Sequence, residues 1–77
     1  MHCVVYKSLL KPETYVFLHT EDAFESIPLP LRETLGRLIK IMNLHLMPER
    51  KLARVDAVEV MSALETRGYF IQMPPTD

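Results

Sequence analysis

The chain has 77 residues, which is enough for one small domain. Hydrophobic residues make up 48% of it and charged residues 25%, a composition that supports a packed core and excludes an intrinsically disordered chain. The formal net charge of −1 gives no general attraction to nucleic acid or to an anionic membrane, and no apolar run reaches the roughly 20 residues that a membrane-spanning helix needs. Cys3 is the only cysteine, which excludes an internal disulfide, and the segment Met1–Lys7 lacks the pattern of a secretion signal. We therefore expect a single cytoplasmic domain over residues 1–77, without a role for the membrane.

Two strands are predicted at the start of the chain. The segment His2–Lys7 (HCVVYK) and the segment Thr14–His19 (TYVFLH) are rich in β-branched and aromatic residues, and the loop between them contains Pro12. We expect the two strands to pair as a hairpin with Lys7 opposite Thr14. This register places three aromatic residues on one face, namely Tyr6, Tyr15 and Phe17. The opposite face then carries Cys3, Val5, Val16 and Leu18, and two apolar faces are typical of a sheet that is covered on both sides.

The middle of the chain predicts a turn, a short helix and a third strand. Thr20–Glu25 is an acidic turn or a short helical start, and a helix of about two turns begins near Pro30 and ends at Gly36. Leu38–Met47 (LIKIMNLHLM) follows as a strand. Its polar positions change phase near Ile41, which predicts either a β-bulge there or a strand that begins after Lys40.

The last part of the chain predicts a helix that begins after Asp56 and ends before Gly68. Asp56 is a good N-cap residue, with Glu59 placed to complete a capping box. Gly68 is expected to adopt a positive φ at the C-terminal end of the helix. A fourth strand follows from Tyr69, in which Gln72 is interpreted as a structural amide that bonds to a neighbouring loop.

The predicted order of elements is strand, strand, helix, strand, helix, strand. We expect an α/β (α+β) fold with one four-stranded sheet and helices on both faces, an α/β/α sandwich. Two short helices would cover such a sheet only partly. An apolar patch that serves as a partner surface is therefore expected around Tyr6, Tyr15 and Phe17, or on the opposite face around Val5, Val16 and Leu18.

Several short patterns together resemble the YcgL family of small bacterial proteins. They are Tyr6-Lys7-Ser8, Ile27-Pro28, Pro48-Glu49-Arg50, Leu52-Ala53-Arg54 and the ending Gly68-Tyr69-Phe70-Ile71-Gln72-Met73-Pro74, with Asp56 twelve positions before the glycine. The resemblance extends over nearly the whole chain. It implies an α/β/α sandwich, and it implies no activity, cofactor or catalytic residue.

Residues with catalytic or metal-binding potential do not form a recognisable site. Ser8 and Lys11 match the S-x-x-K pattern of serine acyl-enzymes, but the other motifs of those enzymes are absent and Pro12 follows at once. His2 and His19 are expected near each other in the hairpin, but Cys3 points to the opposite face, which leaves too few ligands for zinc. The sequence therefore predicts no catalytic residue, metal site or cofactor.

Two function classes stay open. The first is a small interaction module that binds a protein partner or a second copy of itself through the apolar patch. The second is a domain that contacts RNA or a nucleotide through the densest basic cluster, Arg50, Lys51 and Arg54. The low net charge favours the first class.

Overall fold

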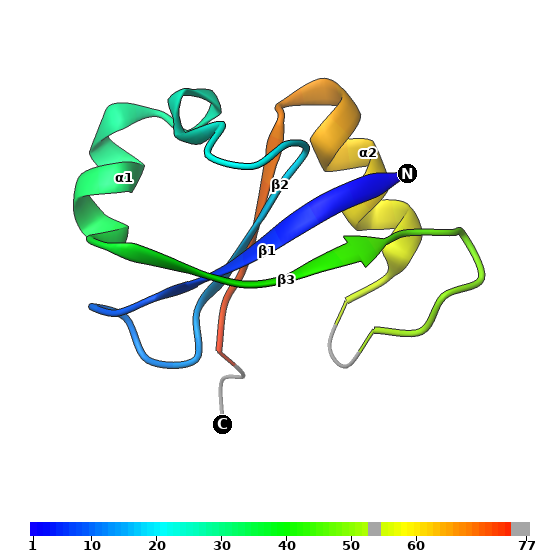
Figure 1. Ribbon diagram of the computed structural model, residues 1–77, viewed down its shortest axis with the longest axis horizontal. Coiled ribbons are helices and arrows are strands. Elements are labelled where there is room, and N and C mark those ends of the chain that lie inside the picture. The colour runs from blue at the N-terminus through cyan, green and yellow to red at the C-terminus, as the bar shows by residue number, and fades with distance from the viewer. Residues whose placement is uncertain (53–54, 75–77) are drawn as a thin grey trace.

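The computed structural model describes residues 1–52 and 55–74. This part of the chain contains four strands, two α-helices and one short 3-10 helix (Figure 1). In chain order they are β1 (His2–Ser8), β2 (Tyr15–Leu18), η1 (Phe24–Ser26), α1 (Leu29–Leu35), β3 (Leu38–His45), α2 (Ala57–Thr66) and β4 (Tyr69–Gln72). The order of strands and helices agrees with the sequence prediction.

The four strands form one sheet in the order β3-β1-β2-β4, and every neighbouring pair is antiparallel. The β1–β2 hairpin is the centre of the sheet, so β3 and β4 are its two edges. Helix α2 connects these two edge strands, and α1 lies at the other side of the sheet (Figure 1). The fold is thus an α+β domain with helices on both faces of one sheet.

Each face of the sheet carries its own core. On one face α2 packs over β1, β2 and β4, and the buried residues there include Cys3, Val5, Phe17, Leu44, Val60, Leu64 and Phe70. The other face is covered by η1 and α1, and its buried residues are Val4, Tyr6, Val16, Leu18, Ile27 and Leu35. Apolar side chains on both faces explain why β1 is an almost unbroken hydrophobic run.

The predicted register of the hairpin is wrong by one residue. Lys7 lies opposite Tyr15, and Tyr6 lies opposite Val16. Because side chains alternate between faces, this shift places Tyr6 on the α1 face, whereas Tyr15 and Phe17 lie on the α2 face. The three aromatic residues therefore do not share one surface.

The predicted irregularity in the third strand is confirmed as a β-bulge. Val5 pairs with Met42 and Tyr6 pairs with Lys40, so Ile41 is the extra residue on β3. The bulge shifts the alternation, so that both Ile41 and Met42 line the same hollow of the surface.

Helix α2 begins and ends where the sequence predicted, but the predicted capping hydrogen bond at its N-terminus is absent. Asp56 is the N-cap residue and has the expected extended backbone, but its side chain forms no capping hydrogen bond. Gly68 has a φ of +87°, and its N–H donates to the carbonyl oxygen of Leu64 at 3.1 Å. This bond closes the last turn of the helix, as predicted for a glycine at this position.

The buried side chain of Ser8 links the end of β1 to the end of α1 by a hydrogen bond. Its hydroxyl donates to the carbonyl oxygen of Leu35 at 2.6 Å and accepts the N–H of Lys11 at 2.9 Å. Both hydrogen-bonding capacities of the hydroxyl group are used by the backbone, so the S-x-x-K pattern is part of a structural turn.

Candidate functional site

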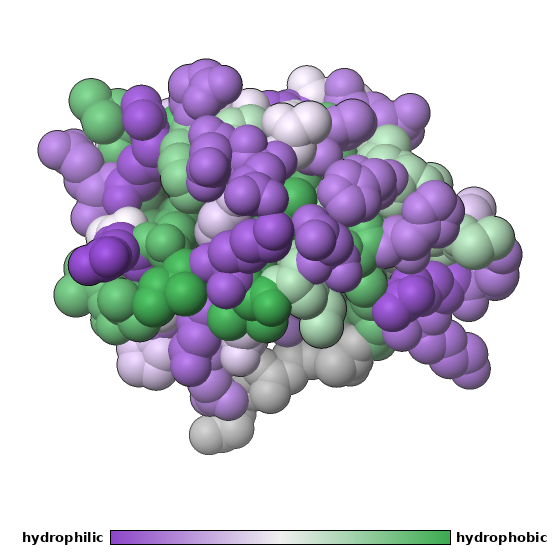
Figure 2. Space-filling model, viewed as in Figure 1, coloured by the Kyte–Doolittle hydropathy of each residue, from purple (hydrophilic) through white to green (hydrophobic). Residues whose placement is uncertain are grey.

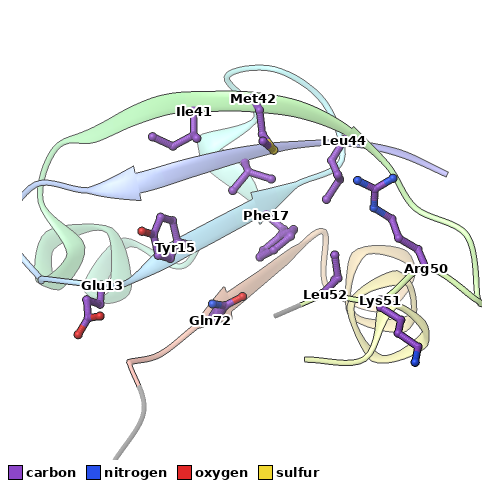
Figure 3. A pocket seen from close by; sticks show the side chains of 11 residues that line it. Glu13, Tyr15, Phe17, Ile41, Met42, Leu44, Arg50, Lys51, Leu52 and Gln72 are labelled. Carbon is purple, nitrogen blue, oxygen red and sulfur yellow. The ribbon is translucent and has the colours of Figure 1, made fainter. Parts of the chain in front are cut away.

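A hollow of 520 Å³ lies on the α2 face, between β3 and β4. Its floor consists of side chains from the two central strands, Val5, Tyr15 and Phe17, and Figure 3 shows Tyr15 and Phe17 lying between the β3 side and the β4 side. Ile41, Met42 and Leu44 of β3 form one wall. The remaining lining residues are Glu13, Arg50, Lys51, Leu52 and Gln72. We call this hollow the β3 groove.

The β3 groove exists because α2 is too short to cover the whole face. A helix of 10 residues is only about 15 Å long. Its buried residues pack over Cys3, Phe17 and Phe70, towards one end of the strands. At the other end no helix of the described residues lies over Tyr15 and Met42, and Met42 is 49% exposed. Part of this face is therefore open to solvent and apolar.

The apolar surface continues along the edge of the sheet. Ile39, Ile41 and Met42 of β3 are between 44% and 49% exposed. In Figure 2 hydrophobic residues gather along the lower edge of the view, where β3 runs, whereas much of the remaining visible surface is hydrophilic. Such a run of exposed apolar residues on an edge strand is unusual for a surface that meets only water.

Arg50 and Lys51 give one end of the β3 groove a positive charge. Both residues are exposed, and within residues 1–52 and 55–74 neither forms an ion pair. Figure 3 shows the Arg50 guanidinium beside Leu44, whereas the Lys51 ammonium points away from the groove. The third member of the predicted basic cluster, Arg54, lies outside the described residues.

Gln72 lies on the far wall of the groove, opposite Tyr15 on the neighbouring strand. The sequence predicted a hydrogen bond from its amide to a neighbouring loop. In the described part of the chain its side chain forms no hydrogen bond. The half-buried amide is a polar group in the lining of the groove.

The aromatic residues predicted as a partner surface have different roles. Tyr6 is only 2% exposed, and its hydroxyl oxygen accepts the N–H of Asp22 at 2.8 Å. Phe17 is 5% exposed and contacts Phe70 edge to face. Only Tyr15 is partly accessible. Ile41 and Met42 were not predicted as site residues, although the β-bulge predicted near Ile41 was the signal that could have marked them.

Cys3 belongs to the core. It is fully buried, and burial raises the pKa of its thiol from 9.0 to about 11, against the opposing effect of the positive charges of the N-terminus and Arg50. Such a thiol is protonated and unreactive at neutral pH. His2 pairs across the sheet with His45, and not with His19 as predicted.

Comparison with known proteins identifies the family. The model of the YcgL domain matches residues 3–75. The chain belongs to the YcgL domain family. It is 42% identical to a YcgL domain-containing protein of Stenotrophomonas maltophilia (strain K279a), over 99% of this chain and 88% of the relative.

Two further relatives give the same result. A YcgL domain-containing protein of Thioalkalivibrio sulfidiphilus (strain HL-EbGR7) is 44% identical over 97% of this chain and 93% of its own length. One from Hydrogenovibrio crunogenus (strain DSM 25203 / XCL-2) is 47% identical over 94% of this chain and 74% of its own length. These matches confirm the resemblance to the YcgL family. In the described part of this YcgL domain, no helix is long and apolar enough to cross a membrane.

Proposed function

We propose that this YcgL domain is a non-catalytic interaction module that binds an apolar segment of a protein partner in the β3 groove. The exposure of Ile41 and Met42, 48% and 49%, beside a buried apolar floor is the observation that supports this function best. Burial of such side chains by a partner removes apolar area from water, which is the main driving force of protein association.

The position of the groove favours an extended partner segment. The groove runs along β3, which is an edge strand with one side unpaired within the sheet. An extended segment can pair with the free backbone of an edge strand while its alternate side chains pack against the exposed apolar side chains of that strand at the rim of the groove. Met42 suits this role because its flexible side chain adapts to different contacts.

The positive charge at the rim of the groove favours an acidic residue in the partner segment. Arg50 lies where the groove meets the loop after β3, and within the described residues it has no acidic partner. An acidic residue of the partner segment would gain a charge-assisted hydrogen bond there. A segment with alternating apolar residues and an acidic end therefore matches the β3 groove.

Crosslinking from the groove tests this function. A photoreactive residue in place of Ile41 should form discrete crosslinked products in cells of the natural host. The same residue in place of Leu29 is the matched control, because Leu29 is an equally apolar residue, 57% exposed, on α1. A second substitution in the same crosslinking variant, Met42→Glu, should abolish the crosslinks from position 41. The bound partner would bury the new carboxylate without an opposite charge, which is costly. Leu29→Glu should leave them unchanged.

The identity of the product distinguishes the possible partners. A product of two copies of the chain, together with a dimer in light scattering, would identify self-association. Equal products from positions 41 and 29, or none from position 41, would contradict the proposal.

Contact with RNA is the alternative function, and Arg50 and Lys51 are its candidate residues. Their neighbouring aromatic side chains offer little for stacking on a base, since Phe17 is buried and Tyr15 is half-buried. Binding of RNA at about 50 mM salt that is lost when Arg50 and Lys51 are changed to Ala would favour this alternative.

A further inference from the structure

A second hollow lies on the opposite face of the molecule from the β3 groove. Its volume is 330 Å³, and it is lined by Phe24 of η1, Arg32 of α1, Gly36 and Arg37 after α1, and Leu38 of β3. The lining residues within the described chain include two arginines and no acidic side chain. We call this hollow the two-arginine pocket.

Neither arginine of the two-arginine pocket is neutralised in the part of the chain that the structure describes. The one ion pair there joins Lys40 to Glu21 at 2.7 Å. Glu33, the next residue after Arg32 on α1, forms no ion pair with either guanidinium group in this part. Because an arginine side chain stays charged at all physiological pH values, two positive charges remain in one hollow.

Arg32 is also short of hydrogen bonds. Its Nε atom is buried and has no hydrogen-bond partner among the described residues. A buried donor without an acceptor is costly and rare in folded proteins. The guanidinium group thus keeps unused hydrogen-bonding capacity beside the pocket.

The backbone beside the pocket is the C-terminal end of α1, whose partial negative charge works against the two arginines in the binding of an anion. The carbonyl oxygen of Arg32 accepts the N–H of Gly36 at 3.0 Å, and that of Leu35 accepts the Ser8 hydroxyl at 2.6 Å. Two of the C-terminal carbonyl groups of α1, which would otherwise repel an anion, are therefore already hydrogen-bonded. The backbone of Arg37 is held as well, since its carbonyl oxygen accepts the N–H of Leu9 at 3.0 Å.

The remaining walls are apolar. Phe24 is half-buried, and its ring contacts Tyr6 edge to face with 5.1 Å between the ring centroids. Leu38 is half-buried as well. Gly36 contributes backbone atoms to the lining. The pocket therefore combines two guanidinium groups with the aromatic ring of Phe24 and the aliphatic side chain of Leu38.

We propose that the two-arginine pocket binds a phosphate monoester with a small aromatic or apolar group. The phosphate dianion balances both guanidinium charges, whereas a carboxylate or a sulfonate balances only one. Guanidinium groups also match the oxygens of a phosphate in geometry. Phe24 and Leu38 would contact the organic group. This inference does not depend on the function proposed for the β3 groove.

A titration with phenyl phosphate tests the proposal, followed by NMR of the arginine Nε–H signals in the full chain. We expect saturable shifts of the Arg32 and Arg37 signals at millimolar ligand. Inorganic phosphate should bind more weakly, because it lacks the ring. Benzenesulfonate, which has the ring and a single charge, should bind more weakly too.

Substitutions locate the site. Arg32→Gln and Arg37→Gln should each weaken binding about tenfold or more, because each removes charge-assisted hydrogen bonds. Arg37 is exposed, so Arg37→Gln keeps the test valid should Arg32→Gln fail to fold. Arg67→Gln is the matched control, since Arg67 lies over the Tyr69 ring and outside the pocket. The proposal is wrong if phenyl phosphate gives no saturable shift up to about 10 mM, or if Arg37→Gln binds it as tightly as the native chain.

Discussion

Gly68→Val should destabilise the fold by about 3 kcal/mol or more. Gly68 has a φ of +87°, a region that a β-branched residue adopts only with strain. A Cβ atom at this position would also lie 3.1 Å from the Cβ and Oγ atoms of Ser26, which belongs to η1 on the α1 side of the sheet. The substitution therefore combines backbone strain with overpacking between two layers.

Urea denaturation measures this effect. Glu65→Val is the matched control, because it places the same side chain on an exposed position of the last turn of α2. The control should cost only a few tenths of a kcal/mol, which is the difference in helix propensity. A loss below about 1 kcal/mol for Gly68→Val would contradict the role assigned to this glycine.

Tyr6→Ala should cost about 3 to 5 kcal/mol, as large-to-small substitutions of buried aromatic residues do. Tyr6 is 2% exposed and packs against Phe24, and its hydroxyl oxygen accepts the N–H of Asp22. Asp22 has a φ of +61°, so this bond supports a turn in a conformation that is uncommon for a residue with a side chain. The substitution would leave a cavity and release the turn.

Met42→Ala is the comparison for Tyr6→Ala. Met42 is half-exposed, so its truncation should cost less than about 1 kcal/mol. The register predicted from the sequence placed Tyr6 on a partner surface, where truncation would be almost neutral. Equal stabilities of Tyr6→Ala and Met42→Ala would therefore contradict the observed register.

The sequence predicted well those features that depend on a local residue type or a local pattern. Gly68 was identified because a glycine after a helical pattern marks the end of the helix, and its positive φ is confirmed. The bulge at Ile41 was identified because polar residues change phase along the third strand. Asp56 was placed correctly as the N-cap residue. Its capping hydrogen bond failed to appear because a cap depends on a side-chain rotamer that sequence does not determine.

The register of the hairpin was beyond prediction for a physical reason. A strand with one polar face has a preferred phase, because a shift of one residue would bury its polar side chains. Both faces of β1 and β2 are apolar, so pairing Lys7 with Thr14 or with Tyr15 buries similar surfaces. Details of the connecting turn decide between them, and the error moved Tyr6 to the wrong face.

The β3 groove was predicted only in outline. Two short helices on a sheet with two apolar faces implied that some apolar surface stays open. Which part stays open depends on where α2 crosses the sheet, and this is a matter of tertiary packing. Arg50 was identified from its charge, whereas its position beside Leu44 follows from the loop after β3 (Figure 3).

Methyl NMR of methionines is the most direct measurement of the central claim, that this domain binds a protein partner through the β3 groove. Met42 lines the groove, and Met47 is similarly exposed, at 47%, without lining it. On addition of the partner recovered by crosslinking, or of a second copy if the chain self-associates, the Met42 methyl signal should shift or broaden. Protection of this methyl group from a soluble paramagnetic agent should rise, while the Met47 signal should stay unchanged. Binding that perturbs Met47 and leaves Met42 exposed and unshifted would contradict the account.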